Sequence, residues 1–251
     1  MQKYKFGDNI LNAIDVSVPQ SNYWMKYGDD AVESQSRFFQ SLGVSHLFAR
    51  RVVAAYPFGT NVMEISDLSF SGYESEKRSR CNGYDGVITS IPEIPLFSGW
   101  GDCPQLLVAG ENSVGLVHTA RDTLDNYILT IFFEMFFRNN TPRKTKVGFS
   151  PYIFPESFDH QYVNLKREDW FNKGCIYKKD NLLYVDLFKM IEDDLLRLGI
   201  TPENIMDAKL NSFKISEDSF KRGGYSVSHR HALSVEGAKE GRGGLCIMIR
   251  G

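Results

Sequence analysis

The chain is poor in the residues that would place it among disulfide-rich, secreted or membrane-spanning proteins. Its 251 residues include only four widely separated cysteines, which form no C-x-x-C pair: Cys81, Cys103, Cys175 and Cys246. Such spacing is not typical of a disulfide framework and favours free thiols in a reducing compartment. The most apolar stretch, residues 127–137, is much shorter than a membrane span and contains Glu134. The first six residues also lack the apolar core of a secretory signal, so we expect a cytoplasmic protein.

An excess of charge of one sign is also missing. The chain has 29 basic and 31 acidic residues, which gives a net charge of -2. A surface that binds nucleic acid or an anionic membrane normally carries a clear excess of positive charge. We therefore expect neither a nucleic-acid partner nor a membrane partner.

The overall composition is that of an ordinary folded protein. Apolar residues make up 42% of the chain and charged residues 24%, which is close to the average for globular proteins. No repeat or low-complexity linker divides the sequence. We expect residues 1–251 to form a single domain with a substantial core.

The pattern of apolar residues predicts a mixture of helices and strands. Helices are expected over residues 31–42, from residue 121 or 122 through Met135, over 186–198, and briefly from Thr201. Strands are expected over residues 52–56, 62–65, 86–91, 106–109, 114–117, 147–152, 208–215 and 245–249. The early strands are not regularly separated by helices, so a doubly wound parallel sheet is not expected. The prediction is an α+β fold with mixed sheets.

The most informative part of the chain, residues 99–123, contains a cysteine and a histidine, Cys103 and His118. The apolar runs 104–109 and 114–117 are separated by a turn-like GENS sequence, which predicts a hairpin. Cys103 would then begin one strand and His118 would end the next, at the same end of the pair. A thiol and an imidazole there, near Asp102 and Arg121, form either a metal half-site or an activated thiolate. The structural alternative is that both groups are simply packed in the core.

Three blocks around these residues resemble the central motifs of the YfiH/laccase-domain family. They read YDGVIT at 84–89, WGDCP at 100–104 and VHTAR at 117–121, where the family has A-D-G-L-V-T, T-A-D-C-x-P and H-A-G-W-R-G. Further matches follow in the expected order: Asn22 with GDD at 28–30, Arg37, GT at 59–60, SHR at 228–230 and GR at 241–242. The resemblance covers residues 22–250, and its strength lies in the ordered combination of these blocks.

The resemblance implies a fold and an activity. Members form one domain in which two packed mixed sheets are flanked by helices, an arrangement related to the catalytic domain of cytotoxic necrotizing factors. They were formerly called polyphenol oxidases, and they act on purine nucleosides by phosphorolysis and by deamination. The implied ligands are therefore a purine nucleoside and phosphate. Multicopper oxidation is excluded for this chain, because five scattered histidines cannot supply a blue-copper site and a trinuclear cluster.

A zinc site is the cofactor that the resemblance implies. The family holds zinc with the histidine of Q-V-H-G, the cysteine of A-D-C and the histidine of H-A-G-W-R-G. Cys103 and His118 match the second and third of these ligands, but Phe58 stands at the first position and cannot bind zinc. His229 is the best substitute, against the alternative of a solvent-facing loop residue. We expect an impaired zinc site in a divergent member.

Three hypotheses about function remain open. The first is a purine nucleoside phosphorylase or deaminase, with Cys103, His118 and Asp102 as catalytic or metal-binding groups. The arginines Arg121, Arg230 and Arg242, together with Asn22 and Phe58, would bind substrate or phosphate in that enzyme; Arg121 matches the family's arginine if one residue has been lost. The second is a metal-free Cys-His hydrolase with Cys103 as nucleophile and His118 as base. The third is a non-catalytic member in which Phe58 fills the pocket or stacks on a base.

Overall fold

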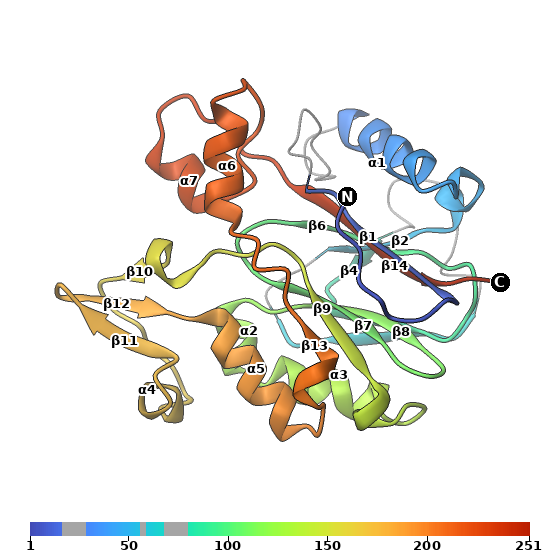
Figure 1. Cartoon of the computed structure of the whole chain (residues 1–251), viewed down its shortest axis with the longest axis horizontal. Coiled ribbons are helices and arrows are strands. Elements are labelled where there is room, and N and C mark those ends of the chain that lie inside the picture. The colour runs from blue at the N-terminus through green and yellow to red at the C-terminus, as the bar shows by residue number, and fades with distance from the viewer. Residues whose placement is uncertain (17–28, 56–58, 68–79) are drawn as a thin grey trace.

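A computed structural model of the chain describes residues 1–16, 29–55, 59–67 and 80–251. Two large β-sheets pack against each other, and helices cover their outer faces (Figure 1). The five-stranded sheet has the order β1 (Ile10–Ile14), β14 (Gly243–Ile249), β6 (Leu96–Trp100), β2 (Val52–Ala55) and β4 (Arg80–Asn82). The six-stranded sheet has the order β13 (Ile205–Met206), β9 (Lys146–Phe149), β7 (Gln105–Ala109), β8 (Val114–His118), β5 (Gly86–Thr89) and β3 (Val62–Ile65).

Both large sheets are mixed. β2 runs parallel to β4 and β6, β3 runs parallel to β5, and β13 runs parallel to β9, whereas the other neighbours are antiparallel. A third, antiparallel sheet has the order β10 (Asp159–His160), β12 (Leu182–Val185) and β11 (Ile176–Lys179). It projects from the body of the molecule beside the short helix α4 (Asp169–Asn172), as Figure 1 shows at the left.

The remaining helices lie around the sheets. They are α1 (Asp29–Ser41), α2 (Arg121–Asp125), α3 (Ile128–Phe136), α5 (Leu187–Arg197), α6 (Ser212–Phe220) and α7 (His229–Ser234). The described residues also form short 3₁₀ helices at Ser45–Arg50, Pro142–Lys144, Pro155–Ser157 and Pro202–Asn204. Within the described ranges, no helix is both long and apolar enough to cross a bilayer.

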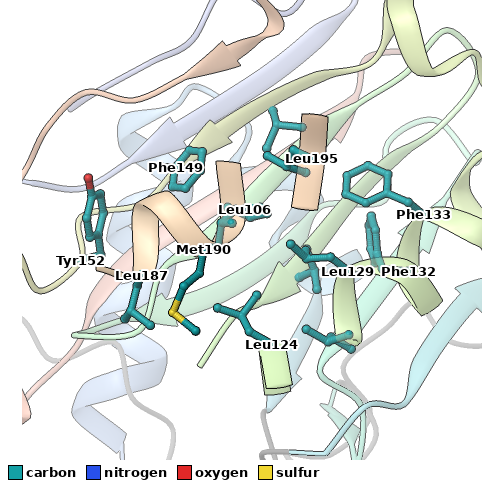
Figure 2. Close-up of a cluster of buried hydrophobic side chains, with 14 of the residues drawn as sticks. Leu106, Leu124, Leu129, Phe132, Phe133, Phe149, Tyr152, Leu187, Met190 and Leu195 are labelled. Atoms are coloured by element: carbon teal, nitrogen blue, oxygen red, sulfur yellow. The ribbon is translucent and has the colours of Figure 1, made fainter. Parts of the chain in front are cut away.

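Alternating side chains of β7 and β8 divide the core into two parts. Leu107 and Leu116 point into the space between the large sheets, where they meet Trp100 and other apolar residues. Leu106 belongs to the opposite core, which is formed with α2, α3 and α5; Figure 2 shows this second cluster. Because successive strand residues face opposite sides, strands buried on both faces must be almost wholly apolar. All five residues of each of these strands are in fact buried.

The sequence prediction of an α+β fold with two packed mixed sheets is confirmed, and most predicted elements are present. The predicted helix from residue 121 is divided into α2 and α3, because Tyr127 adopts a left-handed conformation with φ of 63°. The carboxylate of Asp125 accepts hydrogen bonds from the backbone N–H groups of Lys166 and Arg167 at this break. A loop that joins the third sheet is thereby attached to the junction of the two helices.

The predicted strand at residues 208–215 is wrong. Lys209 has a positive φ of 53°, which turns the backbone away from an extended path. The side chain of Asn211 then accepts a hydrogen bond from the backbone N–H of Phe213 and caps the start of α6. Capping by asparagine outweighs the apolar alternation of the segment.

Candidate functional site

Chemically reactive residues lie together at one end of the interior strands β7, β8 and β5 of the six-stranded sheet. β7 and β8 form the predicted hairpin, and Gln105 at the start of β7 lies directly opposite His118 at the end of β8. Cys103 precedes Gln105 by two residues, in the segment that crosses from β6 of one sheet to β7 of the other. Asp85 comes immediately before β5, the other neighbour of β8. The prediction that Cys103 and His118 lie at the same end of adjacent strands is confirmed.

His118 is held by a buried carboxylate. Its ring atom Nδ1 lies 3.1 Å from Oδ1 of Asp85, and the two side chains are only 4% and 0% exposed. The backbone N–H of His118 also donates to the carbonyl of Asp85 at 2.8 Å. A carboxylate on one ring nitrogen fixes the tautomer and orientation of an imidazole, so that the other nitrogen can bind a ligand or move a proton.

The second oxygen of Asp85 reaches the neighbouring segment of the chain. Its Oδ2 accepts a hydrogen bond of 2.7 Å from the backbone N–H of Gly59. Gly59 directly follows Phe58, the position at which the related family has its first metal ligand. One carboxylate therefore orients His118 and also fixes the chain beside that position.

Cys103 is a half-buried free thiol in a strongly charged environment. Burial, followed by the negative charge of Asp102, raises the pKa of Cys103 to about 12. The charges of Arg242 and Arg121 lower this pKa but do not outweigh the other effects. Without a bound metal, Cys103 is a protonated thiol at neutral pH and a poor nucleophile.

Asp102 has a structural role that the sequence did not indicate. Its Oδ1 accepts a hydrogen bond of 2.8 Å from the hydroxyl of Ser212 at the start of α6. Its Oδ2 accepts one of 3.0 Å from the backbone N–H of Arg230 in the first turn of α7. Both carboxylate oxygens therefore connect the crossover segment to the helices α6 and α7.

The three arginines proposed to bind phosphate come from different elements. Arg121 begins α2 and pairs with Asp122 at 2.8 Å. Arg242 precedes β14, pairs with Glu240 at 2.7 Å, and packs against Gly101, where an added Cβ would lie 3.2 Å from its Nε. Arg121 and Arg242 act electrostatically on Cys103, which places both near the thiol. Arg230 lies on α7 and contacts β10 instead, through the carbonyl of Asp159 at 2.9 Å.

The described residues do not make up a zinc site with three protein ligands. His229, the candidate substitute, is 57% exposed, and its Nδ1 lies 3.2 Å from a carboxylate oxygen of Glu240. Across residues 1–16, 29–55, 59–67 and 80–251, no three histidine, cysteine or acidic side chains are grouped as metal ligands would be. Cys103 and His118 alone do not complete a tetrahedral site for zinc. Asn22 and Phe58 lie outside the described residues.

Sequence reasoning missed two residues of this region. Asp85 belongs to the YDGVIT block, and pairing residues 86–91 with 114–117 would have placed it beside His118. The other is His160, which lies in β10 and contacts Arg230. No local pattern predicts that contact, because 70 residues separate the partners.

Comparison with known proteins identifies relatives of the whole chain. The family described as multi-copper polyphenol oxidoreductase laccase matches residues 18–250. No curated protein matches the sequence. Among solved structures, YlmD from Geobacillus stearothermophilus has a TM-score of 0.77 and 17% identity, with 99% of this chain and 94% of that chain covered.

Two further solved structures share the fold. The Bacillus licheniformis protein YfiH has a TM-score of 0.70 and 17% identity, with coverage of 91% of this chain and 85% of that chain. The Neisseria meningitidis protein NMB0706 has a TM-score of 0.69 and 14% identity, with coverage of 98% and 96%. These likenesses concern the fold. Together with the match over residues 18–250, they show that this chain belongs to the laccase-like YfiH family.

Proposed function

We propose that this protein is a divergent purine nucleoside enzyme of the phosphorylase type, acting in the cytoplasm on a purine nucleoside and phosphate. The observation that carries the proposal is the buried His118–Asp85 pair, at the strand end where Cys103, Arg121 and Arg242 also gather. Buried ionisable pairs next to a concentration of charge are typical of sites that transfer protons. The family resemblance supplies the substrate class.

In phosphorolysis, a phosphate oxygen forms a bond to C1′ of the ribose while the bond from C1′ to the purine nitrogen breaks. The purine leaves with the electron pair of that bond and takes up a proton. We assign the proton transfer to His118, with Asp85 stabilising the charged imidazole. Arg121, Arg230 and Arg242 are assigned to phosphate, because a guanidinium can donate two parallel hydrogen bonds to its oxygens. Asn22 and Phe58 remain candidates for nucleoside binding.

The metal-free Cys-His hydrolase is less well supported. Its nucleophile would be the thiolate of Cys103, and burial with the charge of Asp102 raises the pKa of this thiol to about 12. Asp102, the residue next to the thiol, has both oxygens engaged with α6 and α7. No observation on the described residues favours this function over the first.

A nucleoside panel tests the proposal. Inosine, guanosine and adenosine would be incubated with and without phosphate, and release of the free base, ribose 1-phosphate and ammonia measured. We expect phosphate-dependent base release that His118→Ala abolishes, because the leaving purine then lacks its proton donor, and that Cys175→Ala, a change at a buried cysteine outside the site, leaves unchanged. Ammonia release without phosphate would identify a deaminase instead. Binding of purines without any turnover would contradict the enzyme and support a binding protein.

A further inference from the structure

Thr119 connects the segment that carries Cys103 to the segment that carries His118. It directly follows His118 and is fully buried. The carbonyl of Pro104, the residue after Cys103, accepts two hydrogen bonds from it: the backbone N–H donates at 2.9 Å and the hydroxyl at 2.7 Å. The neighbour of one reactive residue is therefore bound to the neighbour of the other.

A proline at position 104 makes this carbonyl especially important for the attachment. Pro104 is buried and has no backbone N–H, so its carbonyl oxygen is the backbone group that can hydrogen-bond to the end of β8. That oxygen has two lone pairs. The N–H of Thr119 uses one of them and the hydroxyl uses the other. Two bonds fix the direction of the Pro104 peptide as well as its distance, whereas one bond would fix the distance alone.

The contacts on the other side of the crossover segment come from residues that follow β9. The backbone N–H of Gln105 donates to the hydroxyl of Ser150 at 2.9 Å. The backbone N–H of Ile153 donates to the carbonyl of Asp102, also at 2.9 Å. β9 lies on the opposite side of β7 from β8. These bonds hold the crossover segment on the side of β9, and the hydroxyl of Thr119 attaches it to the end of β8.

We propose that Thr119 is a positioning residue, whose hydroxyl fixes the end of β8, with His118, against the crossover segment that carries Cys103. The inference rests on the proposed function, in which His118 protonates the leaving purine. Proton transfer requires heavy atoms within hydrogen-bond reach, and a displacement of about 1 Å can lower a rate about 100-fold. The hydroxyl proton of Thr119 is engaged by Pro104, so Thr119 acts through its neighbours and does not act on the substrate.

Thr119→Val tests the hydroxyl, because valine has nearly the same shape but cannot donate a hydrogen bond. Thr119→Ser keeps the hydroxyl. The matched control is Thr145→Val: Thr145 is also fully buried, and its backbone N–H and hydroxyl donate to one carbonyl, that of Thr141, at 3.1 and 3.0 Å. Thr145 lies beyond the far end of β7 from the crossover segment, since the next residue, Lys146, pairs with Ala109.

The first readout is the reactivity of Cys103, which needs no substrate. Iodoacetamide alkylates accessible thiols, and mass spectrometry of the peptide that contains Cys103 gives the rate. We expect alkylation to be several times faster in Thr119→Val, because the crossover segment is released on one side. Thr145→Val and Thr119→Ser should react at the rate of the unsubstituted protein. No change in Thr119→Val, or an equal acceleration in Thr145→Val, would overturn the inference.

The second readout is a comparison of kcat and KM for inosine phosphorolysis. Thr119→Val should lower kcat about 10-fold and leave KM for inosine nearly unchanged, because the lost hydroxyl affects the placement of reacting groups and not a contact with inosine. Thr119→Ser should recover most of kcat, and Thr145→Val should match the unsubstituted protein. An equal loss of activity in both valine variants would show that the hydroxyl only stabilises the fold, and would overturn the inference.

Amide hydrogen exchange on the unsubstituted protein covers the case in which Thr119→Val fails to fold. The N–H of Thr119 should be protected as strongly as that of Leu116 within β8, because it should open only together with the strand. Exchange at Thr119 as fast as at an exposed loop amide would contradict the inference. If no nucleoside is turned over but Cys103 is alkylated faster in Thr119→Val, the proposed function fails and the anchoring role of Thr119 stands. Turnover with an unchanged kcat in Thr119→Val would refute this inference alone.

Discussion

At the scale of single residues, the site depends on carboxylates more than the sequence motifs suggested. Asp85 connects His118 to the backbone at Gly59, and Asp102 connects the crossover segment to two helices. Each uses both carboxylate oxygens, and their partners lie on different elements. A change of one atom at either position should therefore affect more than one part of the site.

The substitution Asp85→Asn tests whether the negative charge of Asp85 is needed for activity, because asparagine has nearly the same shape and can still accept a hydrogen bond. The amide oxygen could still accept one hydrogen bond, but the uncharged side chain would no longer stabilise a charged His118 imidazole. We expect kcat/KM for inosine phosphorolysis to fall about 10- to 100-fold, with a smaller effect on KM. Asp218→Asn, at an exposed aspartate of α6, is the matched control. Full activity in Asp85→Asn would remove the carboxylate from the mechanism.

The low pKa of His160 predicts how stability depends on pH. The pKa is 6.5 for an ordinary histidine and is lowered to about 4 here, chiefly by burial and then by Arg230. Between these values the unfolded chain binds more protons, so the contribution of His160 is complete above pH 6.5 and is lost as the pH falls toward 4. Denaturant unfolding at about pH 7 and pH 5 should show a larger loss of stability in the unsubstituted protein than in His160→Gln. Equal losses would show that His160 titrates normally.

At the scale of helices and strands, buried polar contacts attach the helices around the sheets. Arg167 and Asp194 of α5 form two hydrogen bonds of 2.7 Å, with side chains only 3% and 4% exposed. The guanidinium also lies 4.0 Å from the ring of Trp170 in α4. This contact joins α5 to the short helix beside the projecting sheet that carries His160.

Removing one partner of this pair should be much more damaging than removing both. We expect Asp194→Ala to lower the free energy of unfolding by about 3–5 kcal/mol, because the buried charge of Arg167 keeps only a 3.9 Å contact with the exposed Asp169. Arg167→Met combined with Asp194→Leu should recover most of that loss. Urea denaturation of the two variants measures the difference. A double variant no more stable than Asp194→Ala would show that the pair itself provides the stability.

A related experiment tests the role of Asp102. Asp102→Ala removes the acceptor for the hydroxyl of Ser212 and for the backbone N–H of Arg230, and should destabilise the protein by about 1–3 kcal/mol. In a double-mutant cycle with Ser212→Ala, the two losses should be less than additive. Additive losses would mean that this hydrogen bond contributes nothing to stability.

How much was predictable from the sequence depends on the range of the interactions. The β7–β8 hairpin follows from local apolar runs and a turn, so the pairing that sets Gln105 opposite His118, two residues after Cys103, was predicted correctly. The contact between Arg230 and His160 depends on how a projecting sheet meets α7, which no local pattern encodes. Residues 208–215 were misassigned because one capping asparagine outweighed their apolar alternation.

At the scale of the whole molecule, the extent of the domain remains a prediction that unfolding can test. Trp100 lies in the core between the large sheets, and Trp170 lies in the core formed with the helices. If residues 1–251 fold as one domain, Trp100→Phe and Trp170→Phe variants should report the same urea midpoint by fluorescence and circular dichroism, after allowance for each substitution's effect on stability. Two separate transitions would indicate two units.

Metal content is a second property of the whole molecule that remains to be measured. With Phe58 at the position of the family's first ligand, we expect purified protein to contain less than one zinc ion per chain. Phe58→His should raise the zinc content if the sequence correspondence is correct. Elemental analysis of both proteins provides the test. Unchanged zinc in a folded Phe58→His variant would show that residue 58 does not occupy that ligand position.

The position of β14 in the five-stranded sheet affects how the chain folds during its synthesis. β14 lies between β1 and β6, with Ile10 facing Ile249 across the pairing. Among the described strands it is the last to leave the ribosome, yet two strands synthesised earlier depend on it for their hydrogen bonds. Such distant pairings slow folding and leave strand edges exposed for longer. During synthesis, the five-stranded sheet therefore stays open until residues 243–249 have emerged, and a chain that stops before residue 243 would present two unpaired strand edges to its neighbours.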